Sequence, residues 1–248
     1  MEPLLELKNI NYSYHTTSGE TKALEDISFS VNKGEFISIV GPSGCGKSTL
    51  LSIIAGLIKA ESGDIVVNGS NIGYMLQKDH LFEWRTIYKN VTLGLEVQNN
   101  LTPASIKNVN KMLDTYGLER FKNARPSELS GGMRQRAALI RTLALEPDLL
   151  LLDEPFSALD YQTRLEVSDD ISRIIKKEDK TAILVTHDLS EAIATGDRVI
   201  ILSKRPATIK RIVPINLSIE NRTPLTSRNA KEFKDYFNMI WEELSDYG

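Results

Sequence analysis

A glycine-rich segment, GPSGCGKST, directly follows an apolar run near the start of the chain. The run Phe36–Val40 is continuously apolar, as expected for a strand covered on both faces. Residues Ser48–Leu57 have the apolar character of a helix. Strand, glycine loop and helix in this order constrain the fold most, because the glycines let successive backbone N–H groups turn towards a phosphate. We therefore predict a phosphate-binding loop before the helix N-terminus.

The loop matches the pattern G-x-x-x-x-G-K-S/T. Lys47 is expected to reach the β- and γ-phosphates, and the Ser48 hydroxyl is expected to ligate Mg²⁺. The sequence therefore predicts that the chain binds and hydrolyses ATP with Mg²⁺. The residues predicted to hold the nucleotide here are Gly41, Pro42, Ser43, Gly44, Cys45, Gly46, Lys47, Ser48 and Thr49.

Strand and helix patterns alternate along most of the chain, which predicts an α/β doubly wound core. Between residues 81 and 145 strand patterns fade, and helical periodicity indicates an inserted helical subdomain, with helices at Ser105–Tyr116 and Gly131–Leu145. The other predicted strands are Ile27–Val31, Asp64–Val67, Ile72–Leu76, Leu149–Leu152, Ala182–Thr186 and Val199–Leu202.

The tail from Leu217 differs from the core, and its apolar residues recur on one face of a helix. We expect this face to pack back on the core, because an apolar face seeks the nearest apolar surface. A partner-binding helix is the alternative. The stripe consists of Phe233, Phe237, Ile240, Trp241 and Leu244.

Two acidic residues end the apolar run LLLLDE. A buried strand ending in a carboxylate places Asp153 where it can hold Mg²⁺ beside the phosphates. Glu154 is expected to point to the other side of the strand end, where it can act as general base towards the attacking water. A core strand followed by a solvated acidic turn is the alternative.

The segment Leu129–Arg136 (LSGGMRQR) predicts a second anion site. Ser130 followed by Gly131 and Gly132 and then a helical run is a helix N-terminus with free N–H groups. A nucleotide held by Lys47 does not need a second phosphate-binding helix N-terminus. We therefore infer that the helix N-terminus at Ser130 serves a nucleotide held by a second copy of the chain.

With these motifs the chain resembles the ATP-binding-cassette (ABC) ATPases over nearly all its length. Their signature is LSGGQ, and here Met133 replaces the glutamine. The resemblance implies a P-loop NTPase (RecA-like) core with an N-terminal antiparallel β subdomain and an inserted helical subdomain. We expect the ATPase domain at residues 1–216, with the insertion at about 81–145, and a short helical tail at 217–248.

The resemblance also assigns roles to isolated residues. Tyr14 looks like the aromatic residue that stacks on adenine, with Tyr12 as a competing candidate. Gln77 resembles the Q-loop glutamine that contacts metal and water, and His187 the switch histidine that contacts the γ-phosphate. Residues 157–160, namely Ser157, Ala158, Leu159 and Asp160, resemble the D-loop at the dimer interface.

The implied mechanism is a head-to-tail dimer that closes on two ATP molecules and reopens after hydrolysis. The resemblance gives catalytic roles to Glu154, His187, Gln77 and Lys47. The implied Mg²⁺ ligands are Ser48, Gln77 and Asp153, and the implied nucleotide contacts from outside the loop are Tyr14, Ser130, Gly131, Gly132 and Asp160.

The net charge of −3 gives no general attraction to nucleic acid, so we expect no nucleic-acid partner. At 248 residues the chain has room for one cassette, which favours a transporter subunit over the larger cassette proteins of DNA repair, chromosome organisation and translation. A cytosolic assembly factor without a membrane partner is the alternative. No apolar run is long enough to cross a bilayer. We therefore expect a peripheral protein on the cytoplasmic face of the cell membrane, bound to a separate permease and served indirectly by a periplasmic or extracellular substrate-binding protein.

The segment after Gln77 carries the predicted permease contact, at Leu81, Phe82, Trp84 and Arg85. Leu81 and Phe82 have the alternative role of pinning the helical insertion to the core. The segment is similar to the LLPWRTV type of nitrate, taurine and sulfonate importers, with Glu83 in place of the proline, and residues 203–207 (SKRPA) resemble their RPG segment. We expect import of a small anion of this type; importers of thiamine precursors or other heterocycles are the alternative.

Overall fold

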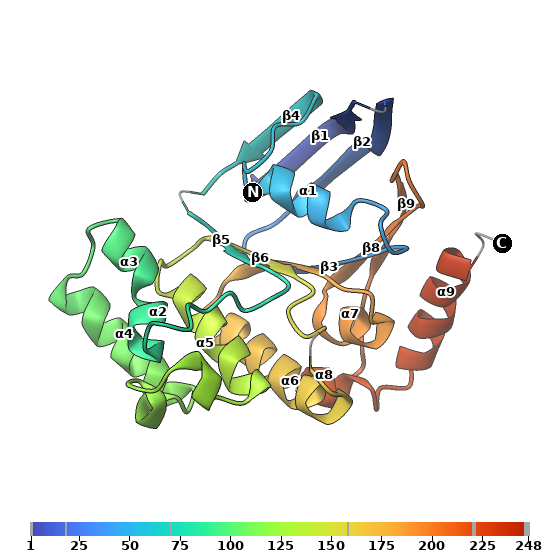
Figure 1. The fold of residues 1–248 in the computed structure, drawn as a ribbon. Helices are drawn as coiled ribbons and strands as arrows, with labels where there is room; N and C mark the ends of the chain where they lie inside the picture. Colours follow the sequence, from blue (N-terminus) through green and yellow to red (C-terminus); the bar gives the residue numbers. More distant parts are fainter. Residues whose placement is uncertain (1, 18, 70, 158, 220–221, 246–248) are drawn as a thin grey trace.

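The computed structural model describes residues 2–17, 19–69, 71–157, 159–219 and 222–245. Its central sheet has the strand order β5-β6-β7-β3-β8-β9 (Figure 1). All neighbouring pairs are parallel except β8 and β9 at the edge. The strands are β3 (Phe36–Val40), β5 (Ile72–Met75), β6 (Leu149–Asp153), β7 (Thr181–Val185), β8 (Arg198–Leu202) and β9 (Ile209–Pro214).

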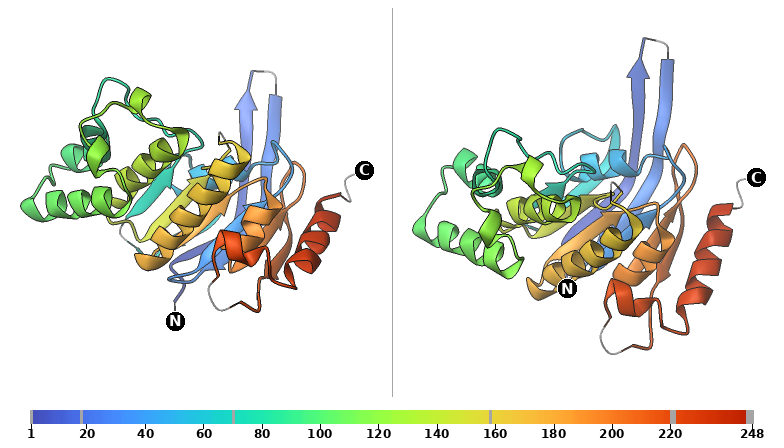
Figure 2. Two further views of the ribbon diagram at one scale, coloured as in Figure 1. Left: turned by 90° about the horizontal axis from the view of Figure 1, so that it is seen from below. Right: turned by 60° about the horizontal axis from the view of Figure 1, so that its bottom comes forward.

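Helices cover both faces of this sheet, which is why β3, β6 and β7 are buried at every residue (Figures 1 and 2). Leu149 and Leu151 pack in one apolar cluster with α1, whereas Leu150 and Leu152 pack in another with α5. The covering helices are α1 (Lys47–Ile54) on one face and α5 (Gly131–Leu143), α6 (Tyr161–Lys177) and α7 (Leu189–Thr195) on the other. The predicted doubly wound core is confirmed.

A second, antiparallel sheet lies beyond α1, in the order β2-β1-β4 (Figure 1). Its strands are β1 (Leu5–Thr16), β2 (Gly19–Val31) and β4 (Ser62–Val67). Apolar side chains of β2 at Ile27, Phe29 and Val31 are buried, while Ser28 between them is exposed. The period-two pattern therefore predicted the end of this strand, Ile27–Val31, and its buried face correctly, but not its start at Gly19.

The predicted helical insertion is confirmed between β5 and β6 (Figure 1). Its helix α4 begins two residues before the predicted start at Ser105, because Pro103 occupies the first turn and Thr102 forms a capping box with Ser105. The elements are α2 (Ile87–Val91), α3 (Leu93–Val97), α4 (Pro103–Thr115), the short turns η1 (Glu119–Phe121) and η2 (Pro126–Glu128), and α5.

The tail forms α8 (Pro224–Ser227) and α9 (Phe233–Ser245). Ile240 of α9 is fully buried against Val40 and Ile201, so the prediction that the apolar face packs on the core is confirmed. Trp241 does not join this contact; it is 58% exposed and stacks on Phe237. The division into residues 1–216 and 217–248 stays a prediction. Among the described residues, no helix is both long and apolar enough to span a bilayer.

Candidate functional site

The glycine loop connects β3 to the N-terminus of α1. Gly44 and Gly46 have φ of +72° and +126°, a region that favours glycine. A Cβ on Gly46 would also lie 2.9 Å from Leu24 Cδ2, so no side chain fits there. Gly46 caps α1 without a side chain, which leaves the first N–H groups of the helix open to an anion.

Lys47 is buried, and its ammonium group folds back over the loop. Its Nζ donates hydrogen bonds to the carbonyl oxygens of Gly41 (2.8 Å) and Pro42 (3.1 Å). These bonds hold the cation beside the N–H groups of the loop. Cys45 has a buried side chain, so its predicted contact with the nucleotide is left to its backbone and stays a prediction.

A cavity of about 180 Å³ opens at this loop. Its walls combine the cation of Lys47 with the hydroxyls of Ser48 and Thr49, and Glu154 closes one side. The predicted loop residues Ser43, Gly44 and Gly46 also line it. The cavity therefore brings the glycine loop and the predicted general base together.

The predicted metal ligands Ser48 and Asp153 are in contact, although they lie far apart in the sequence. Ser48 Oγ donates a hydrogen bond of 3.0 Å to Asp153 Oδ1. Tyr74 OH, on the neighbouring strand β5, donates to Asp153 Oδ2 at 3.4 Å. Burial raises the pKa of Asp153, and the hydrogen bond from Ser48 opposes this rise. A hydroxyl and a carboxylate side by side are hard oxygen ligands that suit Mg²⁺.

Glu154 lies immediately after β6 and has a left-handed backbone, with φ of +44°. This conformation turns the chain sharply, so Glu154 and Asp153 face different partners, as predicted. Glu154 Oε2 lies 3.2 Å from Gln77 Nε2 and 3.2 Å from His187 Nδ1. Of the four predicted catalytic side chains, Gln77 and His187 therefore converge on one carboxylate oxygen of a third, Glu154.

Gln77 contacts Glu154 and Ser157 rather than Asp153. Its predicted role as a metal ligand therefore stays a prediction, while its position beside the base is defined. His187 follows β7 and precedes α7, whose cap Asp188 accepts hydrogen bonds from two N–H groups of its first turn.

Glu191, a buried acid in α7, stabilises the turn that carries His187, and the sequence patterns did not reveal it. Glu191 hydrogen-bonds to Thr186 Oγ1, and Thr186 Oγ1 accepts from Asp188 N at 3.0 Å. Burial raises the pKa of Glu191 to about 8, so this carboxyl group is mostly neutral at pH 7. The available signal was a glutamate four residues beyond the histidine, directly before the apolar residues Ala192, Ile193 and Ala194.

Ser130 caps α5, and its Oγ accepts from Met133 N at 3.4 Å. A Cβ on Gly131 would lie 2.9 Å from Leu159 Cδ2, and one on Gly132 2.8 Å from Val167 Cγ2. The two glycines therefore allow α5 to pack closely on Leu159 and α6, and they also leave the first N–H groups of α5 unshielded by side chains. Ser130 itself is exposed and does not line the cavity at Lys47.

Asp160 caps α6, where its Oδ1 accepts from Thr163 N at 3.1 Å. Hydrogen bonds from Thr163 lower the pKa of the Asp160 carboxyl group. Asp160 is exposed and, like Ser130, is absent from the wall of the cavity. The predicted D-loop residue Ala158 lies outside the described residues.

The two candidate tyrosines for adenine stacking differ in exposure. Tyr12 packs against the apolar cluster around α1, whereas Tyr14 is 39% exposed. Tyr14 OH lies 2.7 Å from Thr49 Oγ1, which places its ring next to the glycine loop. The geometry supports Tyr14, although its contact with adenine stays a prediction.

Arg205 is a cavity residue that sequence reasoning missed. It lies in the β8–β9 turn and lines the cavity together with Lys47 and Glu154. No hydrogen bond or ion pair to another described residue engages its guanidinium group. The available signal was a basic residue in the turn after β8, within the segment that resembles the RPG segment of the importers.

The segment after Gln77 is only partly available as a contact surface. Leu81 is 6% exposed and packs in the core of the helical insertion, so its prediction as a permease contact is wrong. Phe82 and Trp84 stack with ring centroids 4.7 Å apart, and Trp84 is 72% exposed. Arg85 forms an ion pair of 2.7 Å with Glu96, which holds its guanidinium group against α3.

Glu83, the residue that stands in place of a proline, is connected to α5. Its Oε1 lies 2.9 Å from Arg134 Nη2, and Arg134 also binds both carboxylate oxygens of Asp79. Arg134 follows Ser130 by one helical turn. The segment bearing Trp84 is therefore tied by ion pairs to the helix that Ser130 caps.

Comparisons with known proteins agree with this geometry. A model of the ABC transporter family matches residues 24–157. An uncharacterised ABC transporter ATP-binding protein of Bacillus subtilis is 47% identical, over 97% of this chain and 95% of that protein. The taurine import ATP-binding protein of Pelagibacter ubique is 42% identical, over 82% of this chain and 80% of that protein. The aliphatic sulfonates import ATP-binding protein of Bacillus cereus is 34% identical, over 98% and 96%.

Solved structures give the same result. A dimeric ATP-binding cassette in a post-hydrolysis state, bound to ADP and Pi, superposes with a TM-score of 0.74 at 31% identity. The superposition covers 86% of this chain and 99% of that one.

Proposed function

Since the chain belongs to the ABC transporter family as an ATP-binding subunit and ATPase, we propose that it drives an importer for a small organic sulfonate or related anion. Two copies close on two MgATP molecules, and hydrolysis reopens the dimer. The chain binds at the cytoplasmic face of a separate permease, and a substrate-binding protein outside the membrane delivers the ligand to that permease.

The convergence of Gln77 and His187 on Glu154, at the edge of the phosphate cavity, is the observation that carries the hydrolytic role. Lys47 and the loop N–H groups bind the phosphates. Ser48 and Asp153 hold Mg²⁺, which neutralises phosphate charge when bound. Glu154 takes a proton from the attacking water, and His187 and Gln77 position that carboxylate and the γ-phosphate.

The dimer is proposed because one chain encloses only part of a nucleotide. The cavity of about 180 Å³ is smaller than the roughly 300 to 1,000 Å³ of complete ligand sites. Ser130 has an exposed helix N-terminus and is not part of that cavity. A second chain, placed head to tail, completes the site with its own Ser130. The solved relative bound to ADP and Pi is dimeric, which supports this arrangement.

We expect Arg205→Gln to weaken ATP and ADP binding by roughly threefold to thirtyfold, because a charge-assisted contact to phosphate is lost. Binding of adenosine should change little, since it carries no phosphate. Titration of the purified chain with the three ligands measures this. Arg120→Gln, at an exposed arginine remote from the cavity wall, is the matched control. Equal losses for adenosine and ATP would contradict a phosphate contact.

Permease docking is proposed at an apolar groove of about 350 Å³ between β5, α3 and α5. Tyr74, Leu93, Val97 and Leu145 line this groove, and Val97 is 75% exposed. Val97 and the exposed Trp84 offer large apolar side chains to solvent, whereas Tyr74 and Leu145 are partly buried against the core. The ion pair between Glu83 and Arg134 connects the segment that carries Trp84 to α5. Because Ser130 caps α5, permease docking at Trp84 can affect the position of Ser130.

The double variant Trp84→Ala with Val97→Asp tests this function. We expect it to keep the ATPase activity of the isolated chain while permease affinity falls by about thirtyfold or more, as for loss of an interface hot spot. Co-purification from membranes and ligand uptake by the assembled transporter are the measurements. Trp241→Ala, at an exposed tryptophan on α9, is the control. Normal uptake by the double variant, or purification of the wild-type chain without any membrane protein, would contradict the proposal.

The anion preference rests on the taurine and aliphatic sulfonate importer relatives. Uptake assays of the assembled transporter with taurine, an alkanesulfonate, nitrate and a thiamine precursor distinguish this group from the heterocyclic alternative. Uptake of the thiamine precursor alone would replace the anion assignment and leave the ATPase role intact.

A further inference from the structure

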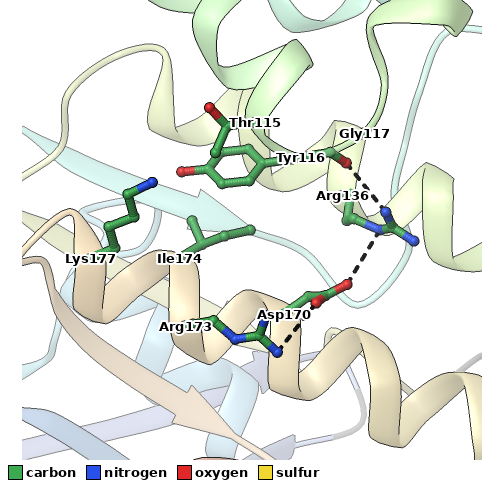
Figure 3. A pocket seen from close by; sticks show the side chains of 8 residues that line it. All are labelled: Thr115, Tyr116, Gly117, Arg136, Asp170, Arg173, Ile174 and Lys177. Carbon is green, nitrogen blue, oxygen red and sulfur yellow. Dashed lines mark hydrogen bonds and ion pairs between the residues drawn. The ribbon is translucent and has the colours of Figure 1, made fainter.

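A separate pocket lies where the helical insertion meets the core, between the end of α4, helix α5 and helix α6 (Figure 3). Its volume is about 420 Å³, within the roughly 300 to 1,000 Å³ of small-molecule sites. It shares no lining residue with the phosphate cavity. The lining residues are Thr115, Tyr116, Gly117, Arg136, Asp170, Arg173, Ile174 and Lys177.

Cations outnumber carboxylates in this lining by three to one: Arg136, Arg173 and Lys177 against Asp170. The pairing of Asp170 with the arginines is loose, at 3.9 Å to Arg136 Nε and 3.7 Å to Arg173 Nη2. Lys177 makes no ion pair with any residue that the structure describes. Because the whole chain carries a net charge of −3, this local positive excess does not follow from composition.

The guanidinium group of Arg136 is less compensated than that of Arg173. Its Nη1 donates to the carbonyl oxygen of Tyr116 at 3.2 Å, and its buried Nε has no hydrogen-bond acceptor and lies 3.9 Å from Asp170. Its positive charge is therefore only weakly offset by protein groups and can attract an anion. Arg173 forms an ion pair with Asp169, which does not line the pocket, so part of its positive charge is neutralised.

The pocket also has an apolar part, formed by the ring of Tyr116 and by Ile174. Both are nearly buried, with exposed fractions of 8% and 5%. The Tyr116 hydroxyl donates to Glu178 Oε1 at 3.2 Å, so its polar end is already satisfied. Figure 3 shows Lys177 on one side of this apolar patch and Arg136 with Arg173 on the other.

We propose that this pocket binds a small organic anion, with its carboxylate, sulfonate or phosphate group against the cations and its apolar body on Tyr116 and Ile174. Charge-assisted hydrogen bonds from Arg136 and Arg173 provide the affinity for the anionic group, and Lys177 adds positive charge on the other side of the apolar patch. The contact with the Tyr116 ring selects ligands with an apolar part.

Calorimetric titration of the chain saturated with MgADP, which fills the phosphate cavity, tests this site. Benzoate, benzenesulfonate and phenyl phosphate are the probes, and the three arms distinguish the anionic groups. Benzamide is the uncharged control and inorganic phosphate the control without an apolar body. We expect saturable binding of at least one aryl anion, at least tenfold tighter than either control.

The double variant Arg173→Gln with Lys177→Gln should weaken that binding by roughly tenfold to a hundredfold, because one charged donor to the anionic group and one further positive charge in the pocket wall are lost. Both side chains are exposed, so the fold is expected to persist, which circular dichroism checks. Lys107→Gln with Lys111→Gln, on the exposed face of α4, makes the same change in net charge outside the pocket. Absence of saturable binding, or equal weakening in both double variants, would overturn the site. ADP affinity, measured separately, shows whether the nucleotide site is intact.

Discussion

Glu154→Gln is expected to abolish steady-state ATP hydrolysis while ATP binding persists. The amide has nearly the same shape as the carboxylate, so contacts with Gln77 and His187 at 3.2 Å remain available. The amide cannot take a proton from water, and loss of a general base lowers the rate by about 10²- to 10⁴-fold. Removal of the negative charge also reduces repulsion of the γ-phosphate, so the ATP-bound dimer should accumulate.

Phosphate release measures turnover, nucleotide titration measures binding, and light scattering with and without ATP measures dimer formation. Glu166→Gln, at an exposed glutamate of α6, is the matched control and should leave all three unchanged. Turnover near the wild-type rate in Glu154→Gln would reject Glu154 as the base. Loss of ATP binding would instead assign the residue a role in holding the nucleotide.

Features that depend on neighbours in the sequence were predictable. The run Phe36–Val40 predicts a buried strand because both faces of a covered strand are apolar. The glycines at 44 and 46 predict a loop with positive φ, which the structure has. The acidic pair after Leu152 predicts two carboxylates at the end of one strand. Because successive side chains of a strand point to opposite faces of the sheet, the two carboxylates are expected to face different partners.

Features that depend on long-range packing were not predictable. Leu81 has a large apolar side chain that suits either a surface contact or the core, and the sequence left both roles open; only the fold shows that it is buried. The motifs predict that Ser48 and Asp153 lie close together as ligands of one ion, but their direct hydrogen bond depends on how α1 lies against β6, which no motif specifies. Arg205 reaches the cavity only because the β8–β9 turn lies beside the loop. A basic residue in a turn carries no such information by itself.

The composite site makes the second large prediction: two inactive variants should restore activity when mixed. Ser130→Asp retains a residue that caps helices well, so α5 should still begin at the same position. Its added negative charge opposes the γ-phosphate held by the other chain. Lys47→Ala removes the cation that reaches the phosphates. Each variant alone should be almost inactive, since every site in its homodimer carries the defect.

In a mixed dimer the loop of the Ser130→Asp chain faces the unchanged Ser130 of the Lys47→Ala chain, and one site is intact. The other site carries both defects. Random pairing of equal amounts should therefore restore up to about a quarter of the wild-type sites, because half the dimers are mixed and each has one intact site of two. ATPase assays of the mixture, with two different affinity tags to prove mixed dimers, measure this. If Ser130 acted on the nucleotide of its own chain, both sites of a mixed dimer would stay defective. Mixed dimers that form but show no activity would therefore reject the proposal that the two composite sites work independently.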